Sequence, residues 1–339
     1  MLEKPNLPDE KIINCLQSEF GLSISELEFL PLGADPNTAV YRAITKNGIS
    51  YFVKLRMGNF EETAVTLPKF LYEQSIGNII PPLETQTGQL WGNIGDFKLI
   101  LYQFIDGRNG FEMNFSAHHW HKFGATLKKL HIAEIPPLIK NRIKVETYSP
   151  KWRDRVKEYM GIIETKSFVD SVAIDLSAFL KLKRDEIFDL LERTERLALK
   201  LGADSPPFTV CHSDVHAGNI LIDENDRFYI VDWDNPILAP KERDLMFVGG
   251  GQGFRGHTAQ EEEILFYEGY GEAEINRFVL TYYRYERIVE DIAVYCDELL
   301  STPKGGEDRA QSLEYLKSNF LPKGTIQVAY QADKTGLFS

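Results

Sequence analysis

Apolar residues recur at two different spacings along the chain, and these spacings predict two kinds of structure. Ile13, Leu16 and Phe20 lie on one face of a helix expected over residues 9–20. Short runs rich in β-branched and aromatic residues follow, and they predict strands at Glu28–Leu30, Val40–Ile44, Tyr51–Leu55 and Phe97–Phe104. The pair Asn47-Gly48 between two of these runs predicts a tight antiparallel hairpin.

Beyond Asp106-Gly107 the helical spacing dominates. Ser116 is placed to cap a helix whose apolar face carries Trp120, Phe123, Leu127 and Leu130. The pattern over residues 140–200 is charged and largely helical, and a long amphipathic helix is expected from Tyr282 to Leu300. Two short apolar runs interrupt this part of the chain and predict strands at Ile220–Ile222 and Tyr229–Val231.

Together these elements predict an α+β fold with a bilobal plan. We expect a β-rich N-terminal lobe over residues 1–105, a hinge near residues 103–107 and a larger, mostly helical lobe over residues 106–339. The chain contains no internal repeat or low-complexity tract. With 339 residues it is long enough for two lobes that each bury a core.

Composition and charge narrow the possible partners. The net charge of −12 argues against a nucleic-acid partner, because a phosphate backbone needs a basic surface. The same charge suits a cationic small molecule, although it also serves solubility. The sequence shows no secretory signal, and no apolar run is long enough to cross a membrane. Three scattered cysteines indicate a reducing compartment, so we expect a cytoplasmic protein; the oligomeric state stays open.

Three polar residues near the middle of the chain have the spacing of a phosphotransferase site. Asn219 follows Asp214 by five positions, and Asp232 follows Asn219 by thirteen. This spacing resembles the catalytic loop and metal-binding aspartate of protein-kinase-like enzymes. Asp214 is the candidate general base, and Asn219 and Asp232 offer the oxygen ligands that Mg²⁺ prefers. The alternative without a catalytic role is that each of these residues only forms a turn.

Two neighbours of Asp214 add detail to this hypothesis. His212 is expected to support the loop through hydrogen bonds. Ser213 stands where protein kinases commonly carry an arginine that docks a phosphorylated activation loop. We therefore expect no regulation by such a loop.

Lys54 is the candidate cation for the nucleotide phosphates. It lies inside the apolar run Tyr51–Leu55, where a buried ammonium group needs an anionic partner. We expect the phosphates and Glu62 to supply that partner. Glu73 ranks second, because Pro68 is expected to interrupt a helix that would carry it. The alternative is an edge-strand lysine that points into water.

Two further segments are candidates for nucleotide binding. The turn from Gly33 to Thr38 contains Asp35 and Asn37, and its backbone N–H groups are expected to cradle phosphate, although an ordinary turn is nearly as good an interpretation. In the hinge, the Gln103 carbonyl and the Ile105 amide are expected to hydrogen-bond the adenine edge.

These motifs together resemble the aminoglycoside phosphotransferase family. The run from His212 to Asn219 has that family's form, His-x-Asp-x-His-x-Gly-Asn. Further likeness, in particular to the spectinomycin phosphotransferases, rests on Tyr148–Arg153, Asp232–Asp234, Leu238–Met246, Tyr267–Gly271 and Glu286–Tyr295. The resemblance extends from Gly33 to about residue 320.

The resemblance implies a protein-kinase-like fold, ATP and Mg²⁺ as cosubstrate and cofactor, and Asp214 as the base that meets a hydroxyl of an aminocyclitol antibiotic. It also implies an acidic pocket for a cationic substrate. The expected counter-charges are Asp234, Glu242, Glu286, Glu290 and Asp291. Trp152 and Tyr148 are candidates for a lid, although core packing is at least as good an interpretation of these two. For each acidic residue, a solvated acidic face is an equally good interpretation.

Two alternatives stay open at this point. The first is a kinase of the same fold that acts on a metabolite of the choline, homoserine or methylthioribose type, because the catalytic loop does not determine the acceptor. The second is a pseudokinase scaffold that binds nucleotide without turnover. The presence of Lys54, Asp214, Asn219 and Asp232 argues against the pseudokinase.

Overall fold

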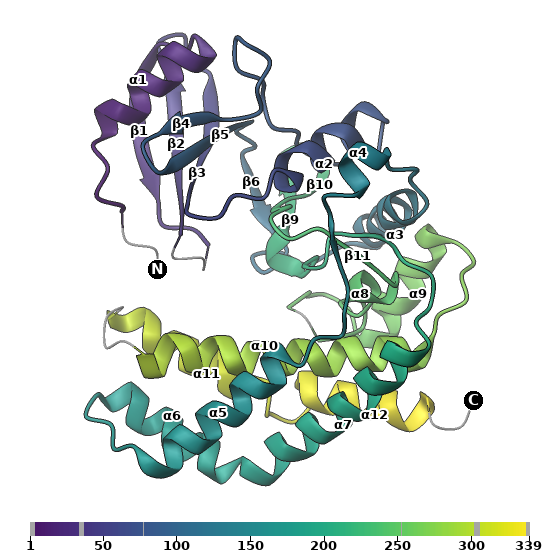
Figure 1. The fold of residues 1–339 in the computed structure, drawn as a ribbon. Coiled ribbons are helices and arrows are strands. Elements are labelled where there is room, and N and C mark those ends of the chain that lie inside the picture. Colours follow the sequence, from purple (N-terminus) through teal and green to yellow (C-terminus); the bar gives the residue numbers. More distant parts are fainter. Residues whose placement is uncertain (1–3, 34–36, 77, 252, 302–305, 337–339) are drawn as a thin grey trace. The chain divides into compact units, whose positions relative to one another are not determined.

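A computed structural model describes residues 4–33, 37–76, 78–251, 253–301 and 306–336 of the chain (Figure 1). The chain forms two compact units. Unit one comprises Met1–Met113, Ala133–Ile143 and Ala217–Pro236, and unit two comprises Asn114–Ile132, Lys144–His216 and Ile237–Ser339. This division differs from the expected boundary at residue 105, because segments distant in sequence return to pair with unit one.

The main layer of unit one is a five-stranded antiparallel sheet in the order β1-β2-β3-β5-β4. Its strands are β1 (Ile24–Leu30), β2 (Thr38–Thr45), β3 (Ser50–Met57), β4 (Gly92–Ile94) and β5 (Phe97–Gln103). Helix α1 (Asp9–Phe20) lies along this sheet (Figure 1) and buries Ile12 and Leu16 against Tyr41, Val53 and Leu99. The expected helix and strands of this region are confirmed.

The expected hairpin at Asn47-Gly48 is also confirmed. Strands β2 and β3 pair in antiparallel fashion, with Ile44 opposite Ser50. Gly48 has a φ of 81°, a left-handed conformation that side chains disfavour, which explains glycine in this turn. Because β3 lies at the centre of the sheet, the hairpin places Lys54 on a strand that is paired on both sides.

A second, three-stranded sheet in unit one has the order β10-β9-β6. It joins β6 (Gly107–Asn109), which follows the expected hinge, to β9 (Ile220–Asp223) and β10 (Phe228–Ile230). This pairing is the reason why residues beyond 105 belong to unit one. The remaining helical elements of the unit are α2 (Thr63–Glu73), α4 (Pro137–Lys140) and the 3-10 turn η1 (Ala217–Asn219).

Helix α2 corrects one local expectation. Pro68 lies inside the helix, which continues to Glu73 without a break. A proline there removes one backbone hydrogen bond. Pro68 and its neighbours Val65, Leu67 and Leu71 are buried, so packing of this apolar face offsets the missing bond.

Unit two is mostly helical. Its helices are α3 (Ala117–His131), α5 (Lys151–Thr165), α6 (Ser171–Leu182), α7 (Arg184–Ala203), α8 (Glu242–Leu245), α9 (Ala259–Tyr270), α10 (Arg277–Ser301), α11 (Gly306–Ser318) and α12 (Thr325–Gly336). A small sheet of β7 (Lys144–Val145), β11 (Ile237–Ala239) and β8 (Thr209–Cys211) accompanies them. The α+β fold, with a strand-rich N-terminal region and a helical C-terminal region, is therefore confirmed.

Helices α3 and α10 form as their sequence patterns predict. The Ser116 hydroxyl accepts a hydrogen bond from the His119 backbone N–H and caps α3, whose Trp120, Phe123, Leu127 and Leu130 are buried. Helix α10 packs against α5, α7, α11 and α12. Most of its side chains between Val279 and Ile292 are buried, so its backbone is held firmly.

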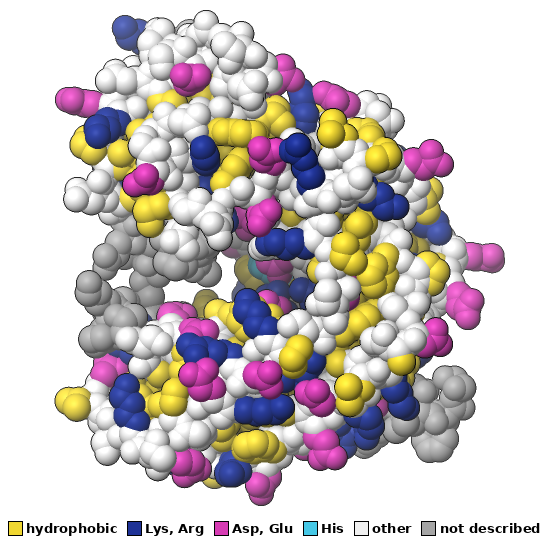
Figure 2. Space-filling model, viewed as in Figure 1, with side chains coloured by type: hydrophobic (Ala, Val, Ile, Leu, Met, Phe, Trp, Pro, Cys, Tyr) yellow, Lys and Arg dark blue, Asp and Glu magenta, His cyan; other side chains and the backbone are white. Residues whose placement is uncertain are grey.

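Surface features match the composition. Figure 2 shows basic and acidic side chains interspersed over the helices of unit two. Cys15, Cys211 and Cys296 are free thiols and all three are buried. Within the described parts of the chain, none of the helices combines the length and the apolar character needed to span a bilayer.

A buried glutamate in unit two makes stability depend on pH. Glu262 of α9 is 6% exposed, and its Oε2 accepts the Gly249 backbone N–H at 3.0 Å. Burial raises the pKa of Glu262 from 4.5 to about 7, so the folded protein retains a proton that the unfolded chain has released between these values. The stabilising contribution of this proton is complete below about pH 4.5 and is lost as the pH rises through about 7.

We therefore expect Glu262→Gln to leave stability nearly unchanged at pH 4.5 and to raise the free energy of unfolding by about 1–3 kcal/mol at pH 8. The glutamine oxygen still accepts the Gly249 N–H. Urea unfolding at the two pH values measures the effect, with the exposed Glu272→Gln as control. An equal change at both pH values would contradict the argument.

Candidate functional site

Lys54 of β3 is buried and is neutralised within unit one. Its Nζ donates to Asp232 Oδ1 at 2.8 Å and to Asp234 Oδ1 at 2.7 Å. Burial by itself lowers the pKa of the Lys54 ammonium, but Asp232 and then Asp234 outweigh that effect and hold the pKa above its ordinary value. Lys54 is therefore a permanent cation beside the expected metal ligand Asp232.

The expected pair between Lys54 and Glu62 is not what the structure shows, and we correct it. Glu62 immediately precedes α2, is exposed, and binds Arg142 instead. Asp234, expected to receive the substrate, belongs to unit one and binds Lys54 and Arg56, with Arg56 Nη1 2.6 Å from its Oδ2. The carboxylates of Asp232 and Asp234 are therefore the anionic partners of Lys54, in place of the expected Glu62.

Asn219 and Asp232 are neighbours because β9 and β10 pair in antiparallel fashion. Asn219 directly precedes β9, Asp232 follows β10 closely, and the Val231 N–H donates to the Asn219 carbonyl at 3.0 Å. Asp232 has a φ of 66°, a left-handed conformation that is strained for aspartate. The hairpin therefore brings an amide and a carboxylate, both hard oxygen donors, to the same end of the small sheet.

Asp35, Asn37, Gln103 and Ile105 are the other candidates for nucleotide binding, and the structure gives the positions of the last three in the fold without testing a nucleotide contact. Asp35 of the phosphate-loop turn lies outside the described residues. Asn37 is exposed just before β2, and its carbonyl accepts the Met57 N–H at 2.9 Å. Gln103 ends β5 opposite Tyr51, and Ile105 lies in the segment between β5 and β6. Their contacts with adenine stay predictions.

The candidate base belongs to unit two and follows strand β8. Ser213, just before Asp214, has a φ of 74°, so the chain turns sharply there. The fully buried Asp244 holds this turn: its Oδ2 accepts the His212 N–H at 2.9 Å and its Oδ1 accepts the Ser213 N–H at 2.7 Å. His212 is buried and its Nδ1 accepts the Asp214 N–H at 3.3 Å, a geometry that suits the expected loop support.

Asp244 also has a histidine partner, which completes a buried polar cluster. His131 Nε2 lies 3.1 Å from Asp244 Oδ2, and His131 Nδ1 lies 2.8 Å from the Tyr270 hydroxyl. Cys211 is close enough to join His131 and Asp244 in a set of possible metal ligands. Because the histidine and carboxylate atoms already hydrogen-bond one another and the loop, we interpret the cluster as support for the catalytic loop.

An arginine that the sequence analysis did not single out binds the candidate base. Arg287 Nη1 of α10 donates to Asp214 Oδ1 at 2.7 Å, and His216 Nε2 lies 3.7 Å from Asp214 Oδ2. Burial raises the pKa of Asp214, but Arg287, then His216 and His212, outweigh it and hold the pKa below its ordinary value. Asp214 is therefore a carboxylate at neutral pH.

The expected counter-charges of unit two have cationic partners inside the chain. Glu242 is 1% exposed; it accepts the Asn276 N–H at 3.0 Å and lies 3.2 Å from Lys241 Nζ. Buried Glu286 accepts from Arg153 Nη1 at 2.5 Å. Glu290 and Asp291 are partly exposed. Arg243 Nη2 lies 3.8 Å from the Glu290 carboxylate, and Arg287 Nε lies 3.1 Å from the Asp291 carboxylate.

These ion pairs account for the acidic residues of α10 without a cationic ligand. The acidic residues of α10 are tolerated because Arg153, Arg243 and Arg287 neutralise them. Glu290 and Asp291 keep some exposure and stay candidates, whereas Glu286 and Glu242 have structural partners. Trp152 is half-buried, with the Lys151 ammonium 3.9 Å above its ring. The three arginines that were missed all lie in runs that carry the family resemblance: Arg153 in Tyr148–Arg153, Arg243 in Leu238–Met246 and Arg287 in Glu286–Tyr295.

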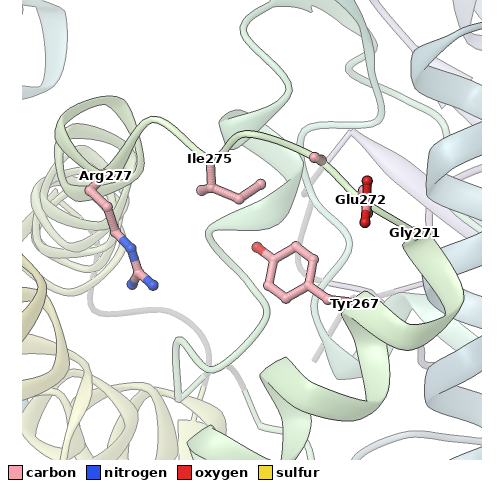
Figure 3. Close-up of a pocket in the computed structure, with 6 residues that line it drawn as sticks. Tyr267, Gly271, Glu272, Ile275 and Arg277 are labelled. Carbon is pink, nitrogen blue, oxygen red and sulfur yellow. The ribbon is translucent and has the colours of Figure 1, made fainter.

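A surface hollow of about 490 Å³ in unit two does not contain these residues. Tyr267 lines it from α9 and Arg277 from the start of α10, with Gly271, Glu272, Ala273 and Ile275 between them (Figure 3). Its lining includes neither Asp214 nor the acidic residues of α10. We therefore do not assign it to the acceptor.

Comparisons with known proteins show the family to which the chain belongs. Residues 28–274 match the family described as the phosphotransferase enzyme family. Spectinomycin phosphotransferase APH(9)-Ia, solved in complex with ADP and spectinomycin, is 36% identical with a TM-score of 0.90, covering 97% of this chain and 100% of that chain. Its AMP-bound complex is 35% identical with a TM-score of 0.83, covering 95% and 98% of the two chains.

More distant structures share the fold alone. Choline kinase LicA from Streptococcus pneumoniae is 14% identical with a TM-score of 0.53, covering 98% of this chain and 99% of that chain. No curated protein sequence gives a significant match.

Proposed function

Because the chain belongs to the phosphotransferase enzyme family, we propose that it transfers the γ-phosphoryl group of ATP to a hydroxyl of spectinomycin and so inactivates the drug. The observation that carries this proposal is the similarity to the spectinomycin phosphotransferase complex with ADP and spectinomycin, at 36% identity over 97% of this chain. Likeness over nearly the whole chain includes the helical region, where acceptor choice resides in kinases of this fold.

Each residue that phosphoryl transfer requires has a proposed role. Asp214 accepts the proton of the attacking hydroxyl, for which its carboxylate form is suited. Lys54 binds the nucleotide phosphates, with Asp232 and Asp234 keeping its charge in place. Asn219 and Asp232 would hold Mg²⁺, since the β9–β10 hairpin aligns their oxygen donors. When bound, Mg²⁺ neutralises charge on the phosphate oxygens.

Acceptor binding rests on the charges near Asp214. Glu290 and Asp291 of α10 are partly exposed, and Asp291 is bound to the same arginine that binds Asp214. Spectinomycin carries two secondary amines that are cationic when protonated. These two carboxylates are the side chains we propose for those amines, with Trp152 as a lid.

A panel of acceptors tests the proposal. The purified protein is incubated with Mg-ATP and, separately, spectinomycin, choline, homoserine or methylthioribose, and ADP release is measured in a coupled assay. We expect release with spectinomycin only, and none when EDTA removes the magnesium. Release with a metabolite alone would overturn the drug assignment and would support a metabolite kinase of the same fold.

Lys54→Met is expected to lower kcat about 10²-fold, because a fixed cation near the transferring phosphoryl group is lost. The KM for ATP is expected to rise as well. Steady-state kinetics with varied ATP measures both parameters. Lys98→Met removes a lysine from neighbouring strand β5 and serves as the matched control, with wild-type kinetics expected. Wild-type kcat in Lys54→Met would remove Lys54 from the site.

A further inference from the structure

Arg287 connects the candidate base to a second carboxylate within one compact unit. Its Nη1 donates to Asp214 Oδ1 at 2.7 Å, and its Nε lies 3.1 Å from Asp291 Oδ1. The Arg287 side chain is 20% exposed, and those of Asp214 and Asp291 are 35% and 24% exposed. One guanidinium therefore links the catalytic loop to α10 in a partly buried environment.

The anchor of this link is rigid. Arg287 projects from the buried middle of α10, where Glu286, Ile288 and Val289 are all buried. Its guanidinium also lies 5.8 Å from the centre of the Phe247 ring. A planar guanidinium held at several points has little freedom to move. Its position therefore fixes the direction of Asp214 Oδ1, and with it the plane of the whole carboxylate.

A purely structural role would not require the contact with Asp214. Asp291 lies one helical turn beyond Arg287 and by itself supplies the carboxylate that a partly buried arginine needs. Arg155 shows such an arrangement: its Nε donates to Asp297 Oδ1 of α10 at 3.0 Å, and its other contacts are with Glu158 and Tyr159. Arg287 differs from Arg155 because it reaches the loop that carries the base.

The charges around Asp214 favour the same conclusion. Arg287 faces it from α10, and His212 and His216 face it from its own loop. Asp291, Asp214 and Glu290 outweigh the effect of burial on the pKa of Arg287 and keep its guanidinium charged. Together these groups keep Asp214 ionised and ready to accept a proton.

We propose that Arg287 is a positioning residue for the reaction: it orients the Asp214 carboxylate toward the acceptor hydroxyl and is itself held by Asp291. The inference rests on the proposed function, since it assigns Arg287 a task only if Asp214 acts as the base. Arg287 does not take the proton. It determines where the oxygen that takes the proton lies.

The test compares Arg287→Met and Arg287→Lys with Arg155→Met, which removes an arginine from a carboxylate of the same helix. We expect Arg287→Met to lower kcat about 10²-fold, because small misplacements of a catalytic group have effects of that size. The KM for ATP should stay unchanged. Arg287→Lys should recover part of kcat, and Arg155→Met should behave as wild type.

Two readouts separate positioning from a general loss of structure. Removing Arg287 takes away the main charge that lowers the pKa of Asp214, so the acidic limb of the kcat profile should move to higher pH. Added guanidinium chloride at millimolar concentration should restore part of the activity of Arg287→Met and none of that of a misfolded variant. Wild-type kcat in Arg287→Met, or a loss that neither lysine nor guanidinium relieves, would overturn the inference.

The two proposals fail in different ways. If the wild-type protein phosphorylates no member of the acceptor panel, the proposed function fails whatever the Arg287 variants do. If wild type is active and Arg287→Met matches it in kcat and pH profile, the role of Arg287 alone fails.

Discussion

Asp214→Asn is expected to abolish turnover, with kcat lower by about 10²–10⁴-fold, while nucleotide binding is largely preserved. The asparagine amide has nearly the same shape, but it does not accept the hydroxyl proton. Lys54, Asn219 and Asp232 belong to the other compact unit, and Lys54 is held there by Asp232 and Asp234 of that same unit. Steady-state kinetics and titration with a fluorescent nucleotide measure the two effects separately.

Asp297→Asn is the matched control for this experiment. Asp297 is also an aspartate paired with an arginine in unit two, and it lies on α10 away from the catalytic loop sequence. We expect it to retain wild-type kcat. If Asp214→Asn kept near-wild-type phosphotransfer, the assignment of the base would be wrong.

The second large effect is expected from Asp244→Asn. The Asp244 carboxylate is fully buried and accepts the backbone N–H groups of His212 and Ser213, so an amide in its place presents an NH₂ group to one of these donors. A buried donor without an acceptor costs about 1–3 kcal/mol, and the lost charge adds to that. The left-handed turn at Ser213 loses its support, so kcat of the folded protein should also fall.

Asp223→Asn separates these two consequences. Asp223 is a buried aspartate that likewise accepts two backbone N–H groups, from Asn225 and Arg227, in the turn between β9 and β10. Urea unfolding should show a stability loss in both variants. Only Asp244→Asn should lower kcat per folded molecule, and an unchanged kcat there would show that the catalytic loop keeps its shape without the carboxylate.

Local patterns predicted the elements well because their causes are local. The Asn47-Gly48 turn, the Ser116 cap and the apolar face of α3 depend on residues a few positions apart. The spacing of Asp214, Asn219 and Asp232 was informative for a related reason: a single hairpin, β9–β10, places the last two together.

Ion pairing was the part that local patterns did not predict. The partners of Lys54 are Asp232 and Asp234, which lie 178 and 180 positions away, and Arg153 binds Glu286 at a separation of 133 positions. Such pairs follow from tertiary structure, and many acidic residues are equally plausible partners when only the sequence is read. For this reason the sequence does not separate Glu62 from Asp232 and Asp234 as the partner of Lys54, or ion-paired acidic residues of α10 from counter-charges for a ligand.

Burial also overrode a local rule at Pro68. The rule that proline interrupts a helix considers only the backbone hydrogen bond, whereas α2 is held by the apolar side chains that it buries. Strand pairing between distant segments likewise moves the boundary between the two units. The sequence placed residues 106–113 after the hinge, but β6 pairs with β9 and returns them to unit one.

Phosphotransfer to spectinomycin is tested by the mass of the drug after incubation with the protein and Mg-ATP. We predict a product heavier than the drug by one phosphoryl group (HPO₃), formed by wild type and absent with Asp214→Asn. The proposed function would be contradicted if spectinomycin stayed unchanged while the same wild-type protein phosphorylated choline, homoserine or methylthioribose in a parallel incubation.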